Sequence, residues 1–140
     1  MTTETSLSPL ALEPSWLPVC TVEDLPRERG ACALVHGSQV ALFRTFDDTV
    51  YAVQQLDPYS GAHVMSRGIV GTRGGTPTVA SPMYKQVFDL RTGQCLDPVG
   101  KDPRHLLAYA VHVADDVVSV GPPVEPGQAL LPDAVERGTG

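Results

Sequence analysis

The sequence has 140 residues, with 16 acidic and 10 basic side chains and a formal net charge of -6. This length suits one domain. An acidic chain whose only lysines are Lys85 and Lys101 lacks the clustered cations of a nucleic-acid surface, and no apolar run approaches the roughly 18 residues that span a bilayer. The N-terminus has neither the basic start nor the apolar core of a secretory signal. We therefore expect a cytoplasmic protein that binds neither nucleic acid nor membrane.

The three cysteines, Cys20, Cys32 and Cys95, are odd in number and far apart in the sequence. This pattern is typical neither of a disulfide framework nor of a zinc site built on cysteines. We expect all three to be small buried apolar residues.

The composition divides the chain into a central domain and two tails. Residues 1–13 are rich in Thr, Ser and Pro, and residues 122–140 are rich in Gly and Pro. Such ends are typical of loose segments. We predict flexible tails at 1–13 and 122–140 around one domain at 14–121.

The central domain has the pattern of an all-β fold. Glycine and proline each occur 13 times, so few windows are long enough for a helix, and the many valines favour strands because their branched side chains pack well on a pleated surface. Thr21 and Asp24 indicate a capped helical turn, and Gly74-Gly75 is typical of a hairpin. About nine short strands suggest an antiparallel sandwich or barrel. The expected strands are residues 16–20, 31–35, 39–43, 50–54, 69–72, 78–80, 86–90, 106–113 and 117–120.

Two loops between these strands carry a pair of related motifs. The first reads Asp57-Pro58-Tyr59-Ser60-Gly61, and the second, with the strand and turn that follow it, reads Ser81-Pro82-Met83-Tyr84-Lys85-Gln86-Val87-Phe88-Asp89-Leu90-Arg91-Thr92-Gly93. Residues 16–120 resemble the Rieske family, whose loops carry Cys-Pro-His and Cys-Pro-x-His, the second followed by a Phe-Asp-Leu strand and a Thr-Gly turn. The resemblance implies a Rieske-like antiparallel β-sandwich or barrel of short strands, with two long loops at one tip.

All four positions that bind the iron–sulfur cluster in that family are altered here. Asp57 and Ser81 stand where the family has cysteines, and Tyr59 and Tyr84 stand where it has histidines. Two thiolates and two neutral imidazoles hold the irons of a Rieske cluster, whereas a serine hydroxyl is a poor iron ligand and a tyrosine phenol, with a pKa near ~10, keeps its proton. We therefore expect no metal and no bound cofactor in this chain.

The other thiol and imidazole side chains do not restore the ligand set. Cys95 follows the second loop and His63 lies in the first, while His36, His105 and His112 fall elsewhere in the sequence. Because a cluster needs four ligands that converge from two adjacent loops, we expect these residues to be too scattered to hold one.

The second loop narrows the resemblance to one branch of the family. Ser81-Pro82-x-x-Lys85-Gln86, followed by Gly93-x-Cys95, is similar to the small subunit of assimilatory NAD(P)H-dependent nitrite reductase. That family shares the Rieske fold and typically lacks the cluster ligands. The resemblance implies an accessory subunit without catalytic residues of its own. It would brace a large subunit that carries flavin, an iron–sulfur cluster and sirohaem and reduces nitrite to ammonium in nitrate assimilation.

The polar residues of the two loops leave two interpretations open. Asp57, Tyr59, Ser81 and Tyr84 either hold the loops together by hydrogen bonds, which we favour because facing loops need satisfied polar groups, or they contact the large subunit. Lys85 is either a docking charge or a solvated one, with equal weight.

Two further residues complete the partner-facing candidates, which are His63, Arg67, Tyr84 and Lys85. His63 and Arg67 would steer nitrite toward the partner, although ordinary loop polarity is the simpler interpretation. Two other functions also stay open: a Rieske-type two-iron two-sulfur electron-transfer protein, and a stand-alone binding module with this fold. Bound iron would indicate the first, and co-purification with a large subunit would exclude the second.

Overall fold

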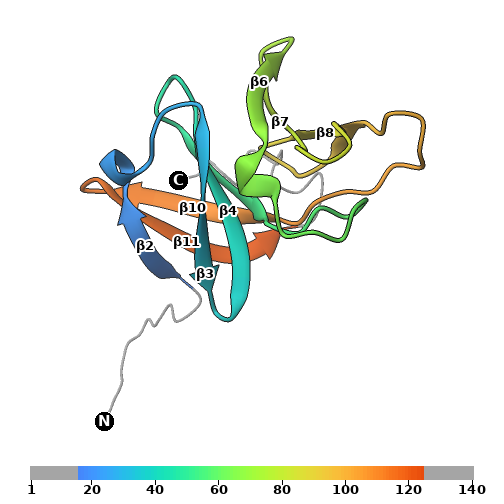
Figure 1. The fold of residues 1–140 in the computed structure, drawn as a ribbon. Helices are drawn as coiled ribbons and strands as arrows, with labels where there is room; N and C mark the ends of the chain where they lie inside the picture. The colour runs from blue at the N-terminus through green and yellow to red at the C-terminus, as the bar shows by residue number, and fades with distance from the viewer. Residues whose placement is uncertain (1–15, 125–140) are drawn as a thin grey trace.

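The structure, a computed structural model, describes residues 16–124, which form two antiparallel β-sheets (Figure 1). The tail expected at 1–13 lies outside the described residues, as do residues 125–140. The all-β class is confirmed, because the described part consists of strands, loops and two short 3-10 turns. Within it, no helix is long and apolar enough to cross a membrane.

The larger sheet has six strands in the order β2-β11-β10-β5-β4-β3. It curves so that its edge strands β2 and β3 come into contact (Figure 1). Val40 and Leu42 of β4 face a core inside this curve, whereas Ala41 and Phe43 face a second core on the other side. The strand bounds are β2 Leu17–Thr21, β3 Arg29–Val35, β4 Ser38–Arg44, β5 Val50–Gln54, β10 Ala108–Ala114 and β11 Val117–Val124.

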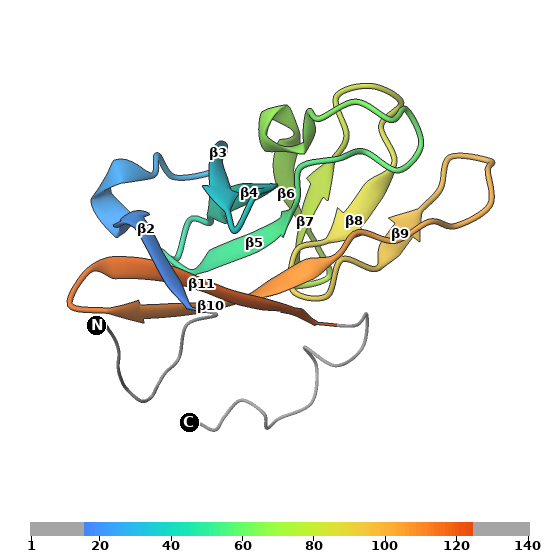
Figure 2. The ribbon, with the colours of Figure 1, turned by 90° about the horizontal axis from the view of Figure 1, so that it is seen from below.

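The smaller sheet has four strands in the order β6-β7-β8-β9. The second core, which includes Phe43, Met65, Phe88 and Leu106, joins it to the larger sheet and to the loops. Figure 2 shows the smaller sheet beside the end of β5 from which the first loop leaves. The strand bounds are β6 Ile69–Arg73, β7 Thr76–Ala80, β8 Val87–Asp89 and β9 Cys95–Asp97.

Local signals in the sequence are confirmed at two turns. Thr21 caps the 3-10 turn η1 (Val22–Asp24): its hydroxyl accepts from the Asp24 N–H at 3.3 Å, and the Asp24 carboxylate accepts from the Thr21 N–H at 2.9 Å. Gly74 and Gly75 adopt φ values of 55° and 85° in the turn between β6 and β7. Both turns therefore follow from residues that are adjacent in the chain.

Three expectations from the sequence differ from the structure. Strand β9 was not predicted, and β11 runs to Val124, into the segment that was assigned to the C-terminal tail. The expectation that all three cysteines are buried is wrong, because Cys32 is exposed and Cys20 and Cys95 are half-buried. Cys32 lies on β3, an edge strand of the larger sheet.

Candidate functional site at the loop tip

Three loops meet at one end of the molecule, which we call the loop tip. The first loop is residues 55–68, and it includes the 3-10 turn η2 (Met65–Arg67); the second is residues 81–86. Figure 2 shows these two loops together at the upper right, next to the third loop, residues 98–107, which connects β9 to β10. The two loops expected at one tip are thus accompanied by a third that the sequence did not indicate.

Asp57 and Ser81 join the first and second loops. Both side chains are completely buried, and the Ser81 hydroxyl donates to Asp57 Oδ2 at 2.6 Å. Asp57 Oδ1 accepts from the Tyr59 N–H at 2.9 Å, and Ser81 Oγ accepts from the Met83 N–H at 3.1 Å. Hydrogen bonds to a buried carboxylate are strong, so this pair stabilises the conformation of each loop and also holds the two loops together. The arrangement corresponds to the loop-bracing interpretation.

Tyr59 points toward the third loop. Its hydroxyl donates to the carbonyl oxygen of Asp102 at 2.9 Å and accepts from the Arg104 N–H at 2.8 Å. Burial raises the pKa of the Tyr59 phenol, and a hydrogen bond with Cys95 raises it further. The phenol therefore stays protonated at neutral pH and serves as a brace between the first and third loops.

Cys95 and His105, which the sequence suggested were scattered, lie next to this tyrosine. The Cys95 sulfur is 3.5 Å from Tyr59 Oη, and the Cys95 N–H donates to His105 Nδ1 at 2.9 Å. Gly93 brings them together: its N–H and carbonyl bond to Asp89 and Leu106, its φ is 80°, and a Cβ there would overlap the Leu106 carbonyl. Because this close approach depends on tertiary packing, spacing in the sequence did not reveal it.

Tyr84 and Lys85 lie at the surface of the second loop. The Tyr84 side chain is 50% exposed, and Lys85 is also exposed, with a φ of 69°. Tyr84 and Tyr59 both line a cavity of about 690 Å³ that the sequence did not reveal. The other residues that line this cavity are Gln86, Val99, Lys101, Asp102 and Arg104.

The other two partner-facing candidates lie away from this cavity. His63 is exposed and forms a bridge with Leu56 within the first loop. Arg67 lines a separate hollow with Glu28 and Arg29, on the side of the first loop that packs against β3. The structure therefore places Tyr84 in the lining of the cavity and leaves Lys85 exposed beside it, outside the lining, and it does not bring His63 or Arg67 there.

The residues at the four altered positions do not fit an iron–sulfur cluster. Asp57 and Ser81 bond directly to each other, which leaves no room for an iron between them, and both faces of the Tyr59 hydroxyl are used by the third loop. Oxygen donors also match poorly to a centre that needs thiolates and neutral imidazoles. In residues 16–124, no group of three or more His, Cys, Asp and Glu side chains is placed to hold a metal ion.

The fold and the paired loops identify the class of protein. Residues 15–121 match the family described as Rieske-like [2Fe-2S] domain, and the chain belongs to this family. The small subunit of NADH nitrite reductase from Escherichia coli K12 is 37% identical over 106 residues, which cover 75% of this chain and 95% of that protein. A crystal structure from Mycobacterium tuberculosis, assigned as an NADH-dependent nitrite reductase small subunit, has 45% identity and a TM-score of 0.71 and covers 76% of this chain and 94% of that one. Within the Rieske-like family, the chain belongs to the nitrite reductase small subunits.

A third relative is much longer than this chain. The nitrite reductase large subunit of Klebsiella oxytoca is 42% identical over 106 residues, which are 76% of this chain and 11% of that protein. A stretch similar to this domain is therefore part of that large-subunit chain.

Proposed function

We propose that this chain is the accessory subunit of a cytoplasmic NAD(P)H-dependent nitrite reductase and docks on the large subunit through the loop tip. The flavin, iron–sulfur cluster and sirohaem that carry electrons to nitrite are then all on the large subunit, and the product is ammonium for nitrate assimilation. This chain holds no cluster and has no catalytic residue. Its contribution is a preorganised surface that braces the large subunit near its redox centres.

The buried Asp57–Ser81 hydrogen bond is the observation that carries this proposal. It replaces the metal as the connection between the two loops, so the tip is rigid before any partner binds. A rigid surface loses little conformational entropy on association, and most of its contact energy then contributes to affinity. The fold thus keeps the shape of an electron-transfer tip and uses it for binding.

The surface of the tip has the composition of a protein interface. Met83, Tyr84 and Val99 are exposed by 46%, 50% and 49%, although all three are large and mostly apolar. Lys85 and Lys101 lie beside them. Tyr and Met are enriched in interfaces, and grouped exposed apolar side chains mark contact surfaces.

Two further observations support parts of the proposal. The Klebsiella oxytoca relative joins a similar domain to a large subunit in one chain, which is the arrangement expected when the two parts work in contact. The free thiols of Cys20, Cys32 and Cys95 fit the reducing conditions of the cytoplasm.

The test is co-expression of the tagged full-length chain with the large subunit of the same organism. We expect the two to purify together, the isolated small chain to be colourless and free of iron, and nitrite reduction by the large subunit to be higher with the small chain than without it. Bound iron with visible absorption would identify an electron carrier instead. A large subunit that never co-purifies would overturn the docking role.

A further inference from the structure

Gln86 has an unusual environment in the lining of the cavity. Its side chain is completely buried, and within the described residues neither Nε2 nor Oε1 of its amide has a hydrogen-bond partner. Its backbone is well held, since the Gln86 carbonyl accepts from the Ser81 N–H at 2.9 Å. A buried amide without partners destabilises the free protein. The same amide is available to a ligand that enters the cavity and reaches Gln86.

The walls of this cavity carry positive charge in an acidic protein. Of the two lysines of the chain, Lys101 lines the cavity, and Lys85 precedes Gln86 in the second loop without being part of the lining. Arg104 is also in the lining, and its guanidinium donates to the Pro58 carbonyl at 3.3 Å. Asp102 is the one carboxylate among the described residues of the lining, and its carbonyl oxygen is already used by Tyr59.

Among the described residues, no ion pair joins these cations to a carboxylate. The ion pairs found in residues 16–124 involve Arg27, Arg44, Arg73 and Arg91, each on another part of the fold. Lys85, Lys101 and Arg104 are therefore available to an anionic partner, and their charge is opposite in sign to that of the chain as a whole.

We propose that the cavity receives an extended acidic segment of the large subunit. A peptide group of that segment pairs with the Gln86 amide, and its carboxylates pair with Lys101 and Arg104. This inference rests on the proposed function. It accounts for both features of the cavity, because an amide with a free donor and a free acceptor matches a peptide group, whereas a simple anion would leave Gln86 Oε1 unpaired.

The segment reaches the amide by displacing the side chain of Tyr84. Gln86 is inaccessible to water in the free chain, while Tyr84, two residues earlier, is half-exposed and lines the same cavity. Exposed aromatic side chains change rotamer on binding without any change in the backbone. The hydrogen bonds around Asp57 and Ser81 keep the loop itself in place during this change.

The test compares variants of the full-length chain for affinity to the purified holo large subunit by biolayer interferometry. We expect Gln86→Met to weaken binding about fivefold, because one hydrogen-bonded peptide contact is lost, while its thermal midpoint is equal to or above that of the wild type. We expect Lys101→Glu to weaken binding about tenfold and to reduce the dependence of affinity on salt.

Arg27→Glu is the matched charge control. The Arg27 side chain is 58% exposed and bonds to Asp48, in the turn between β4 and β5 at the end of the larger sheet away from the point where β5 leads into the first loop. We expect the affinity of this variant for the large subunit to stay within about twofold of that of the wild type, since the altered charge lies outside the proposed contact.

The outcomes separate this inference from the proposed function. If the wild-type chain binds the large subunit and Gln86→Met and Lys101→Glu bind equally well, the cavity is not the docking point, although the subunit role stands. If only Lys101→Glu is weakened, the peptide pairing is wrong. Competition by sodium nitrite at matched ionic strength would show a small-anion site and overturn the inference. If the wild type does not bind at all, the proposed function itself fails.

Discussion

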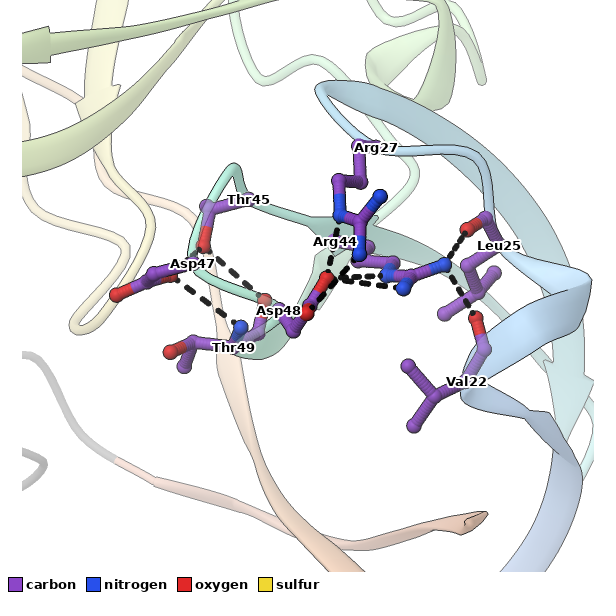
Figure 3. A network of polar contacts seen from close by, with 8 residues as sticks. All are labelled: Val22, Leu25, Arg27, Arg44, Thr45, Asp47, Asp48 and Thr49. Carbon is purple, nitrogen blue, oxygen red and sulfur yellow. Dashed lines mark hydrogen bonds and ion pairs between the residues drawn. The ribbon is translucent and has the colours of Figure 1, made fainter.

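The two ends of the larger sheet differ in whether their charged side chains have hydrogen-bond and ion-pair partners. At the end of β4, around Arg44, each charged group shown in Figure 3 has partners. Asp48 accepts from Arg27 Nε at 2.6 Å and from Arg44 Nε at 2.9 Å, and Arg44 Nη1 also donates to the carbonyls of Val22 and Leu25 at 3.1 and 2.9 Å. The network ties the segment after β2 to the turn between β4 and β5. The charged groups of this network therefore find their partners within the chain itself.

At the other end, in the loop tip, the buried pair Asp57 and Ser81, which we call the lower layer of the tip, has its polar groups paired. Some other polar groups of the tip are not paired. Asp57 and Ser81 satisfy each other, but above them the Gln86 amide is unpaired and two lysines lack counter-charges among the described residues. Natural proteins pair nearly all buried polar groups, and each exception needs an explanation, of which a functional role is one. We infer from this comparison that the end around Arg44 stabilises the domain, whereas the unpaired groups of the loop tip gain their partners when another protein binds.

Asp57→Ala gives the largest expected effect and tests the lower layer of the tip. It leaves the Ser81 hydroxyl and the Tyr59 N–H buried without their acceptors, and we expect a loss of about 2–4 kcal/mol in the free energy of unfolding. Urea denaturation measures this loss. Asp57→Asn keeps an acceptor and is the control, with a smaller loss. A change below about 0.5 kcal/mol in Asp57→Ala would mean that the pair does not brace the loops.

Arg44→Ala tests the opposite end and should have the next largest effect. The side chain is 13% exposed and donates to two carbonyls that are partly buried, so we expect a loss of about 1–3 kcal/mol in the free energy of unfolding. Arg27→Ala is the control, because the Arg27 side chain is 58% exposed and its bond to Asp48 is screened by solvent. Equal losses in the two variants would contradict the distinction between buried and exposed partners. Binding of the large subunit should be unchanged in both.

The pH dependence of stability reports the same end of the sheet. The hydrogen bond from Arg27, together with Arg44, holds the pKa of Asp48 below its usual value. A carboxyl with a lowered pKa in the folded state adds stability above its unfolded pKa of about 4, and this stability is lost as the pH falls through the folded value. We expect Asp48→Asn to flatten the acid limb of a stability profile measured from pH 7 to 2.5. An unchanged acid limb would show that the ion pairs do not contribute.

The fold followed closely from local patterns in the sequence, and its one missed strand shows their limit. Strands rich in Val, and turns such as Gly74-Gly75, were recognisable because the signal is carried by adjacent residues. Strand β9 has only the residues Cys95–Asp97, too few for an alternating pattern, and it exists because β8 lies beside it. Pairing with a neighbour, which sequence periodicity does not encode, decided this element.

The candidate site shows the same limit: some of its residues are recognisable from motifs of adjacent residues, and others come together only through tertiary packing. The loop motifs identified Asp57, Tyr59, Ser81 and Tyr84, and the structure places all four at the loop tip. The cavity was missed because its other wall comes from the third loop, which has no motif. Whether the amide of Gln86 finds a partner depends on that wall, so no pattern in the second loop alone could reveal it.

Asp102→Asn should have the smallest effect and tests the sign of the charge that the cavity accepts. The substitution removes the Asp102 carboxylate from the lining and keeps the main-chain carbonyl that Tyr59 uses, so the fold is preserved and the positive potential rises. We expect the affinity for the large subunit to increase about twofold, the size typical of one exposed charge. Asp115→Asn removes the same charge at the turn between β10 and β11, far from the loop tip, and should leave the affinity unchanged. Weaker binding by Asp102→Asn alone would mean that the cavity receives a cation. The two ends of the sheet would then differ in how many of their polar groups have partners, but not in the charge that they present to a partner protein.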